Sequence, residues 1–361
     1  MNKLDKARKE INEIDKAMAE LFERRMNAAK DVAEYKKENG LPVFDASREE
    51  EVIRRNSAYI ENDDIKAHYV NFLKSTMNVS KEYQRKLLRG MKIAYSGVEG
   101  AFGYIAAKKL FPDSEIVAYA DFTDAYRAVE NGECDNAVLP IENSYAGDVG
   151  AVMDLIFSGS LYINAITDIP VVHNLIGCYC ATVDTVKNVT SHPQALSQCA
   201  EYIKRRGFNE IACSNTAIAA KQVAEKNDPT LAAIASAETA SIYGLNVLEH
   251  GINTSRNNTT RFAVFSRTVN MPEKSKKMGE NFILVFTVKN EAGALAKTLD
   301  IIGAFGFNMR SLRSRPMKEL IWNYYFYIEA EGNINSPDGK DMLKALGATC
   351  DRLRLVGTYK N

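Results

Sequence analysis

Basic side chains interrupt the apolar pattern of the N-terminal quarter of the chain at helical core positions. Apolar residues recur at spacings of three and four between positions 4 and 35, which indicates a helix with a heptad seam. Arg25 stands where this series requires an apolar side chain, and Lys36 follows eleven residues later, ~16 Å along the same face. These two cations could bracket a small anion. The alternative is that Arg25 only sets the helix register or reaches past the seam to solvent.

A third cation of this helix, Arg8, lies too far away to join the same ligand. It precedes Arg25 by seventeen residues, which is ~25 Å along one helix axis. An antiparallel partner helix could bring it to the site. A helix from residue 4 to 39 would be ~54 Å long and could not bury its apolar stripe within one small module. The pattern therefore predicts a helical dimer.

Neutral and acidic hydrogen-bonding groups accompany these cations on two further helices. Asp45, Arg48 and Glu49 stand where the second helical pattern begins. Ser80 and Gln84 share one face of the third at positions i and i+4. The set contains several cations but no His, Cys or evident nucleophile. It favours a dianionic ligand whose charge redistributes in a unimolecular rearrangement, with preorganised electrostatics as the source of catalysis.

Three polar motifs follow or open strands in the middle of the chain. They are Pro140–Ser144 with Gly147, Ser191–Gln194, and Thr259–Phe262. Taken singly, such residues most often cap helices or form turns. Together they bring hydroxyls, amides, one arginine (Arg261) and one carboxylate (Glu142) to positions that can converge on one cleft.

A glycine-rich strand-to-helix turn leaves two functions open for this segment. Gly97-x-x-Gly100-x-x-Gly103 follows a predicted strand, and Asp121 comes about twenty residues later, the position of a ribose-binding acid in a dinucleotide site. An NAD-dependent dehydrogenase is therefore an alternative. The tight Gly-x-Gly turn is absent, however, and an anion-holding helix N-terminus explains the pattern more simply.

Composition limits the remaining possibilities. The chain has 361 residues, 46% of them hydrophobic, with 46 Lys+Arg against 46 Asp+Glu, as in soluble globular proteins of two or three domains. Zero net charge argues against general nucleic-acid binding. No signal peptide or membrane-spanning run is evident. Four histidines without an HExxH or Cys/His cluster predict no metal site, and we interpret His173 and His192 as structural.

Cysteine usage favours a reducing, cytoplasmic environment. The six cysteines are scattered without a CxxC motif, and in a chain of this length they indicate buried free thiols. Cys178 and Cys180 alternate in a predicted strand, Leu175–Ala181. They would therefore point to opposite faces of the sheet.

Three segments with different periodicities divide the chain. Residues 1–89 carry helical periodicity alone and predict an all-α module. Strand and helix patterns alternate over 91–268, which predicts a two-lobed α/β domain with a ligand cleft. A polar linker, 269–279, leads to 280–361, where the order βαββαβ is that of a ferredoxin-like fold.

The N-terminal segment resembles the all-helical chorismate mutase family. Eight residues carry the resemblance: Arg8, Arg25, Lys36, Asp45, Arg48, Glu49, Ser80 and Gln84. The resemblance implies an intertwined helical dimer. In it, Arg25, Arg48 and Arg8 of the partner subunit would hold the two carboxylates of chorismate.

The same resemblance implies roles for the remaining polar groups. Lys36 and Gln84 would hydrogen-bond the ether oxygen of chorismate as its bond breaks. Glu49 and the region of Asp45 would orient the ring hydroxyl, and Ser80 belongs to the same predicted catalytic set.

The α/β segment, from about residue 92 to 267, resembles prephenate dehydratase. Its Thr-Arg-Phe motif is the most specific match, and the supporting matches are Ser191–Gln194 with Cys199, Asn215–Ala217 and Tyr243–Leu245. This family expels the ring hydroxyl of prephenate with loss of CO2 and forms phenylpyruvate. The leaving hydroxide needs a proton donor, and CO2 leaves more readily from a less polar environment.

This second resemblance implies a set of site residues. Thr260 would be the proton donor, Arg261 would anchor a substrate carboxylate, and Phe262 would line the ring site. Glu142 would act as a second acid or as a structural carboxylate. The residues that would hydrogen-bond the substrate are Asn143, Ser144, Ser191, Gln194 and Thr216.

The C-terminal segment resembles an ACT regulatory domain. Two motifs carry the resemblance: Gly293, Ala294 and Leu295 at the first strand–helix junction, and Ser314, Arg315 and Pro316 further on. Gly293 would let the backbone of a ligand approach closely. Arg313 stands where members of that family usually carry Glu. The resemblance implies feedback inhibition by phenylalanine, and a purely dimerising module is the alternative.

The three resemblances together imply a bifunctional chorismate mutase–prephenate dehydratase with a phenylalanine-sensing domain. Its substrates would be chorismate and prephenate, with no cofactor, metal, nucleic acid or membrane involved. We expect a homo-oligomer of at least two chains. The alternatives are a mutase fused to a prephenate dehydrogenase, and a non-enzymatic binding protein that responds to amino acids.

Overall fold

The computed structural model describes residues 2–38, 46–255, 257–272, 279–317 and 324–360. The chain divides into two compact units, Met1–Lys92 and Ile93–Asn361, and each is described by itself. The second unit contains both the α/β segment and the C-terminal βαββαβ segment. The division between those two segments remains a prediction.

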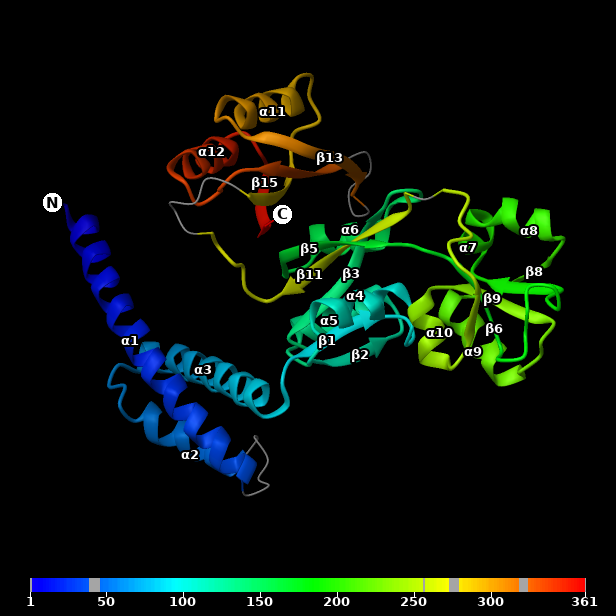
Figure 1. Ribbon diagram of the computed structural model, residues 1–361. Helices are drawn as coiled ribbons and strands as arrows, with labels where there is room; N and C mark the ends of the chain where they lie inside the picture. The colour runs from blue at the N-terminus through cyan, green and yellow to red at the C-terminus, as the bar shows by residue number, and fades with distance from the viewer. Residues whose placement is uncertain (1, 39–45, 256, 273–278, 318–323, 361) are drawn as a thin grey trace. The chain divides into compact units, whose positions relative to one another are not determined.

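The first unit consists of three helices, α1 (Lys3–Glu38), α2 (Ala46–Ser57) and α3 (Asp63–Arg89). α3 packs against both α1 and α2 (Figure 1). It begins after Asn62, whose side chain accepts a hydrogen bond of 2.9 Å from the backbone N–H of Asp64. Burial in this unit is uneven, because five apolar residues of the α1 seam are between 42% and 59% exposed: Leu4, Ile11, Ile14, Met18 and Leu21.

A mixed sheet in the order β5–β11–β3–β1–β2 forms the first lobe of the second unit. Its strands are β1 (Lys92–Ser96), β2 (Glu115–Tyr119), β3 (Asn136–Asn143), β5 (Tyr162–Pro170) and β11 (Thr259–Ser266), with β4 (Gly147–Asp148) beside β3. Its helices are α4 (Phe102–Leu110), α5 (Phe122–Glu130) and α6 (Gly150–Ser158). β11 is antiparallel to both β3 and β5, so it is held on both edges and its register is fixed.

The second lobe is built on another sheet, in the order β10–β6–β9–β7–β8. Its strands are β6 (Asn174–Gly177), β7 (Asn188–Ser191), β8 (Asn209–Ala212), β9 (Leu231–Ala235) and β10 (Asn246–Glu249). Its helices are α7 (Pro193–Gln198), α8 (Ala200–Arg206), α9 (Thr216–Lys226) and α10 (Ala237–Tyr243). β9 is completely buried at the centre, as its unbroken apolar sequence predicts.

The C-terminal segment has the predicted order βαββαβ. Its elements are β12 (Glu280–Thr287), α11 (Ala294–Ala304), β13 (Asn308–Pro316), β14 (Tyr324–Glu331), α12 (Pro337–Gly347) and β15 (Arg352–Lys360). The helices α11 and α12 pack together on the sheet β13–β14–β12–β15 (Figure 1). This sheet continues into that of the first lobe, where Gly357 of β15 pairs with Ile163 of β5.

One strand is shorter than predicted. β6 ends at Gly177, so Cys178 and Cys180 lie in a turn rather than in the predicted strand Leu175–Ala181. Their Sγ atoms are 3.5 Å apart, which corrects the expectation that they point to opposite faces. The alternation argument failed because it holds only while the chain stays extended.

The glycine-rich turn before α4 contacts another part of the protein. The hydroxyl of Thr239 in α10 donates to the carbonyl of Gly100 at 2.7 Å, and that of Tyr243 donates to the carbonyl of Glu99 at 2.8 Å. A Cβ on Gly100 would lie 3.2 Å from the Thr239 methyl. Glycine is therefore explained here by close packing of α10 against the turn.

A membrane-spanning helix and a metal site each need features that the described ranges lack. None of the helices there has the length and apolar character needed to cross a membrane. No group of three or more His, Cys, Asp or Glu in those ranges is placed to hold a metal ion.

Candidate active sites

The three helices of the first unit enclose a pocket of about 290 Å³. Its polar lining consists of Arg25, Lys36, Arg48, Glu49, Ser80, Lys81 and Gln84. Four of these described residues are cations and one is a carboxylate, so the pocket carries a net positive charge. Such a pocket suits a ligand with more than one negative charge.

Arg25 is fixed in place by α3. Its guanidinium donates to the hydroxyl of Ser80 and, at 3.3 Å, to the carbonyl of Thr76. The hydroxyl of Ser80 in turn donates to the carbonyl of Thr76 at 3.0 Å. Burial lowers the pKa of Arg25 from its usual value, although an arginine stays charged. A guanidinium held this way needs little reorganisation when it meets a ligand.

Gln84 and Lys81 complete the α3 side of the pocket. The amide oxygen of Gln84 is buried and has no hydrogen-bond partner, which costs roughly 1–3 kcal/mol unless a ligand supplies one. Lys81 contacts Glu49 of α2 at 2.6 Å. Lys81 is a site residue that was not predicted, although it shares a face with Gln84 at positions i and i+3.

Two of the residues predicted for this site are not placed in the pocket. Arg8 is exposed near the start of α1 and is not part of the pocket lining, as its distance along the helix requires. Asp45 lies outside the described residues. Arg48 lines the pocket and also pairs with Glu51 at 2.7 Å.

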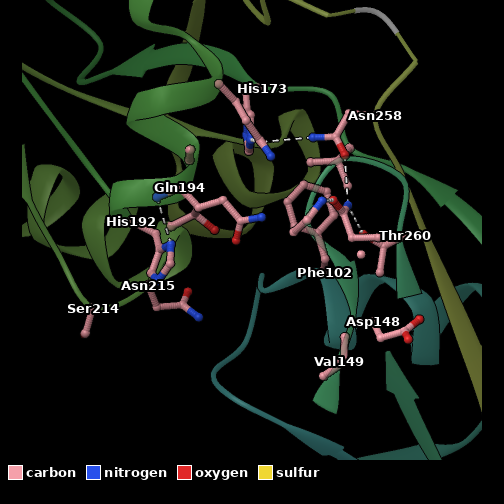
Figure 2. Close-up of a pocket in the computed structure, with 17 residues that line it drawn as sticks. Phe102, Asp148, Val149, His173, His192, Gln194, Ser214, Asn215, Asn258 and Thr260 are labelled. Carbon is pink, nitrogen blue, oxygen red and sulfur yellow. Dashed lines mark hydrogen bonds between the residues drawn. The ribbon is translucent and has the colours of Figure 1, made fainter. Parts of the chain in front are cut away.

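A second pocket, of about 360 Å³, lies between the two lobes of the second unit. Figure 2 shows its polar side chains, which come from both lobes. They are Asn143, Asp148, His173, His192, Gln194, Gln198, Ser214, Asn215, Thr216, Asn258 and Thr260. The described lining contains no Lys or Arg, so the groups available to hold an anion are hydroxyls, side-chain amides, imidazoles and backbone N–H groups.

Thr260 is oriented by the residue directly opposite on the neighbouring strand. β11 pairs Thr260 with Asn143 of β3, and the Asn143 amide nitrogen lies 2.9 Å from the Thr260 hydroxyl oxygen. The Asn143 amide oxygen accepts from the backbone N–H of Tyr145 at 3.0 Å and of Ala146 at 2.9 Å. Because Asn143 donates to Thr260, the hydroxyl hydrogen of Thr260 is available to another acceptor.

The start of α9 provides backbone donors in the same pocket. Asn215 caps this helix by accepting a hydrogen bond of 2.8 Å from the N–H of Ala217. Ser214, Asn215 and Thr216 all line the pocket. The N-terminus of a helix carries unpaired N–H groups and a partial positive charge, which attract a carboxylate.

Three of the predicted substrate-binding residues are not part of this pocket's lining. The Ser191 hydroxyl donates to the carbonyl of Ile234 at 2.6 Å, and the Ser144 hydroxyl donates to the carbonyl of Asn257 at 2.9 Å. Phe262 is only 2% exposed, within the sheet. The two serines show how short hydroxyls bond backbone carbonyls, whereas Phe262 is absent from the lining because its side chain is buried elsewhere.

Arg261 and Glu142 lie in a different cavity, on the other side of the sheet. This cavity of about 650 Å³ contains both side chains. Neighbouring residues of a strand point to opposite faces, so Arg261 cannot share a cleft with Thr260. Its guanidinium contacts Glu329 of β14 at 2.8 Å, Glu142 at 3.4 Å and Asp168 at 3.7 Å. The predicted convergence of Arg261 and Thr260 is therefore corrected.

The ion pair of Arg261 with Glu329 is largely shielded from solvent. Burial raises the pKa of Glu329, but hydrogen bonds from Arg261 and Tyr359 outweigh this effect, so its pKa lies below the usual value. Both partners are thus charged at neutral pH. Removal of either charge would leave the other uncompensated, which is strongly destabilising in a buried pair.

Two arginines of β13 reach the first lobe. Arg313 contacts Glu142 at 2.6 Å and Asp148 at 3.1 Å, and Arg315 contacts Asp154 of α6 at 3.1 Å. Ser314 and Pro316 lie beside them at the end of β13. Gly293, with φ of +81°, caps α11, and Ala294 and Leu295 form its first turn.

Two family models match the chain. They are chorismate mutase type II, over residues 7–85, and prephenate dehydratase, over residues 93–270. A bifunctional chorismate mutase/prephenate dehydratase of Buchnera aphidicola subsp. Acyrthosiphon pisum is 30% identical over 368 residues, which cover 98% of this chain and 95% of the relative. The second match includes the turn Gly97–Gly103, so the alternative of an NAD-dependent dehydrogenase is wrong.

Solved structures resemble the second unit. A prephenate dehydratase of Arthrobacter aurescens in complex with L-Phe has a TM-score of 0.69 at 27% identity, over 75% of this chain and 90% of its own. GqqA, described as a novel type of quorum quenching acylase, has a TM-score of 0.69 at 29% identity, over 74% of this chain and 97% of its own.

Proposed function

Because the chain belongs to the family of bifunctional chorismate mutase/prephenate dehydratases, we propose that each of its two pockets performs one of these reactions. The enzyme converts chorismate to prephenate and prephenate to phenylpyruvate. The observation that supports this division is the contrast in lining. The helical pocket is rich in cations, whereas the described lining of the other has neutral donors and a positioned hydroxyl.

In the helical pocket the mutase step requires only binding and electrostatics. Chorismate carries two carboxylates, and the cations Arg25 and Arg48 are the groups that would hold them. Negative charge develops on the ether oxygen as its bond to the ring carbon breaks. Lys36 and Gln84 line the pocket and would stabilise that oxygen, Lys36 through its ammonium group and Gln84 through its amide N–H₂. Preorganised donors of this kind lower the barrier because they need no rearrangement.

In the second pocket the dehydratase step requires a proton donor and a way to release CO2. The electron pair of the bond to the ring carboxylate forms the aromatic ring, and the hydroxyl leaves with a proton as water. Thr260 would donate to this hydroxyl. The other carboxylate, on the side chain of prephenate, would lie at the start of α9. Without a Lys or Arg in the described lining, the departing carboxylate would gain little stabilisation, which favours its loss.

The resemblance to an acylase raises a second possibility for this pocket. Acyl transfer needs a nucleophile whose proton is taken by an adjacent base. Among the described residues, Thr260 instead receives a hydrogen bond from Asn143. His192 accepts one from the backbone N–H of Gln194 at 3.2 Å. This arrangement supports proton donation by Thr260 rather than its activation as a nucleophile.

We further propose that the C-terminal segment is an ACT domain that binds phenylalanine. The element order, the left-handed Gly293 at the start of α11 and the L-Phe complex of the Arthrobacter dehydratase support this. Arg313 would not recognise an amino group, because it is already paired with Glu142 and Asp148. It would instead link this domain to the strand that carries Asn143.

The exposed seam of α1 supports a homodimer. Five large apolar side chains in a row, each at least 42% exposed, are unusual for a helix without a partner. A second copy packed antiparallel along α1 would cover them and could bring its Arg8 to the pocket. We expect a dimer or a multiple of it by analytical ultracentrifugation at micromolar concentration. A monomer there would contradict this proposal.

The activity is tested by adding chorismate to the full chain without any nucleotide. Phenylpyruvate should accumulate, with prephenate as the intermediate, and millimolar phenylalanine should slow the second step. Strict dependence on NAD, with 4-hydroxyphenylpyruvate as the product, would contradict the dehydratase assignment. If phenylalanine leaves the dehydratase rate unchanged and gives no heat of binding by calorimetry, the regulatory proposal is contradicted. The assignment of the two enzymatic activities would not be affected.

A further inference from the structure

A continuous row of hydrogen-bonded side chains runs along the wall of the second pocket. It joins Thr260, Asn143, Asn258, Gln198 and His173, and all five line the pocket. The Asn143 amide nitrogen donates to the amide oxygen of Asn258, and the Asn258 amide nitrogen donates to that of Gln198, both at 2.9 Å. The same Gln198 oxygen lies 2.9 Å from Nε2 of His173. Figure 2 shows His173, Asn258 and Thr260 around the cavity.

The polarity of this row is fixed from one end by the backbone. The N–H groups of Tyr145 and Ala146 can only donate, so the Asn143 atom that they contact must be its oxygen. Its amide nitrogen then points to Asn258 and must meet an oxygen there. The nitrogen of Asn258 therefore faces Gln198 and requires an oxygen in turn.

The same reasoning determines the tautomer of His173. Because Gln198 presents an oxygen, Nε2 of His173 must carry the proton, and Nδ1 is left as an acceptor. His173 is 2% exposed, and Nδ1 is buried without a hydrogen-bond partner. The ring is also held by the edge of Phe102, with centroids 6.1 Å apart. A buried acceptor with no partner in a ligand pocket is a position for a donor from the ligand.

The two ends of the row thus face the pocket with opposite polarity. Thr260 accepts from Asn143 and keeps its hydroxyl hydrogen to donate onward, whereas Nδ1 of His173 in this tautomer can only accept. Prephenate with both carboxylates ionised has a single hydrogen-bond donor, its ring hydroxyl. That hydroxyl is also the group that must receive a proton in order to leave as water.

We propose that the row Thr260–Asn143–Asn258–Gln198–His173 sets hydrogen-bond polarity in the dehydratase site, with Gln198 as its central positioning residue. The proposal rests on the proposed dehydratase function. The Thr260 hydroxyl donates a hydrogen bond to the oxygen of the ring hydroxyl. Nδ1 of His173 accepts a hydrogen bond from that ring hydroxyl, directly or through one water. Gln198 is only 8% exposed and is the one member bonded to both Asn258 and His173. Loss of the Gln198 amide would remove the hydrogen bonds that orient Asn258 and His173.

Two substitutions of Gln198 test this role. Gln198→Met keeps the length but removes the acceptor, and we expect kcat with prephenate to fall ~10-fold or more with little change in KM. Gln198→Glu keeps an acceptor for both neighbours, so kcat at high pH should stay near the wild-type value. Mutase activity is the internal control, because its pocket is in the other unit. Equal, pH-independent losses in both variants would overturn the proposal.

The pH profile separates a polarity role from a merely structural one. In the wild type, burial lowers the pKa of His173, against a smaller opposite effect of Gln198, so the imidazole stays neutral into mildly acidic solution. The other titratable groups of the described lining are Asp148 and His192. A carboxylate at position 198 would raise the pKa of His173 and favour a proton on Nδ1. Dehydratase activity of Gln198→Glu should therefore be lost at higher pH than that of the wild type as the solution is acidified.

The tautomer can also be measured without any activity. In the full chain labelled with 15N-histidine, NMR at pH 7 should show His173 as a neutral imidazole with the proton on Nε2, assigned by comparison with His173→Phe. A proton on Nδ1 would overturn the proposal, whatever the kinetics show. Failure of the wild type to convert prephenate would instead refute the dehydratase function, while the NMR result would still decide the polarity of the row.

Discussion

Replacing Arg25 by alanine should reduce kcat/KM for chorismate by ~10²–10³-fold or more and leave the conversion of added prephenate unchanged. The guanidinium is held by Ser80 and Thr76 and faces a pocket of net positive charge. Its removal takes away a preorganised donor, and the Ser80 hydroxyl oxygen loses the hydrogen bond that it accepts. The measurement is the loss of chorismate absorbance, with phenylpyruvate formation from prephenate followed in parallel.

Arg24 is the matched control for this substitution. It carries the same charge one position earlier but is exposed on α1, so Arg24→Ala should retain mutase activity. Arg25→Lys keeps the charge and loses the planar fork of donors, and it should recover only part of the rate. Equal effects of Arg24→Ala and Arg25→Ala would show that net charge, rather than the positioned guanidinium, determines the rate.

A mixture of two inactive variants tests whether the site is shared between subunits. In a dimer with Arg8 supplied by the partner, Arg8→Ala and Arg25→Ala chains combine into hybrids in which one of the two sites is intact. After mixing in equal amounts and exchange of subunits, about a quarter of the wild-type mutase activity should return. No recovery, with hybrids shown to form, would place both arginines in the site of one chain or exclude Arg8 from it.

Thr260→Ala should lower kcat for prephenate by ~10²–10⁴-fold, the range in which a positioned proton donor contributes, and leave chorismate mutase activity unchanged. The hydroxyl is positioned by Asn143 at 2.9 Å. Methyl replacement removes the donor while β11 remains paired on both edges. The rate of phenylpyruvate formation at saturating prephenate is the measurement, because the loss is expected in kcat rather than in KM.

Two variants, Thr259→Ala and Thr260→Ser, are the controls for Thr260→Ala. Thr259→Ala removes the same atoms from the preceding residue of β11, where Asn143 contacts only the backbone carbonyl, at 3.3 Å, so activity should persist. Thr260→Ser restores a hydroxyl and should recover most of the rate. If Thr260→Ala keeps a kcat within a few-fold of the wild type, the proton comes from another group or from water.

Most of the polar lining of the helical pocket could be predicted from the sequence, for a physical reason. The period of 3.6 residues places Arg25 and Lys36 on one face over a distance set by the helix rise alone. Ser80 and Gln84 follow the same rule on α3. Only Lys81 was overlooked, because a lysine at a helix surface is ordinarily solvated.

The pocket of the second unit was harder to predict, since its members come from separate segments. His173, Gln198 and Asn258 lie between β5 and β6, at the end of α7 and before β11, and no local periodicity relates them. The buried strand β9 is easier to predict, because a continuous apolar run marks it. Thr260 and Arg261 were predicted to share one cleft because they are adjacent in sequence. The pleat of a strand instead directs adjacent side chains to opposite faces of the sheet.

The two consecutive pairs Asn143–Glu142 and Thr260–Arg261 have a consequence for how this sequence can evolve. A single layer of backbone separates the hydroxyl and amide on one side from the guanidinium and carboxylate on the other. A slip of β11 by one residue would exchange them, and the guanidinium would enter the cavity that we propose as the dehydratase site. The pairing of β11 with β3 shifts register between Arg261 and Phe262, directly beside these two pairs of residues. Insertions and deletions near it should therefore be selected against more strongly than most single substitutions.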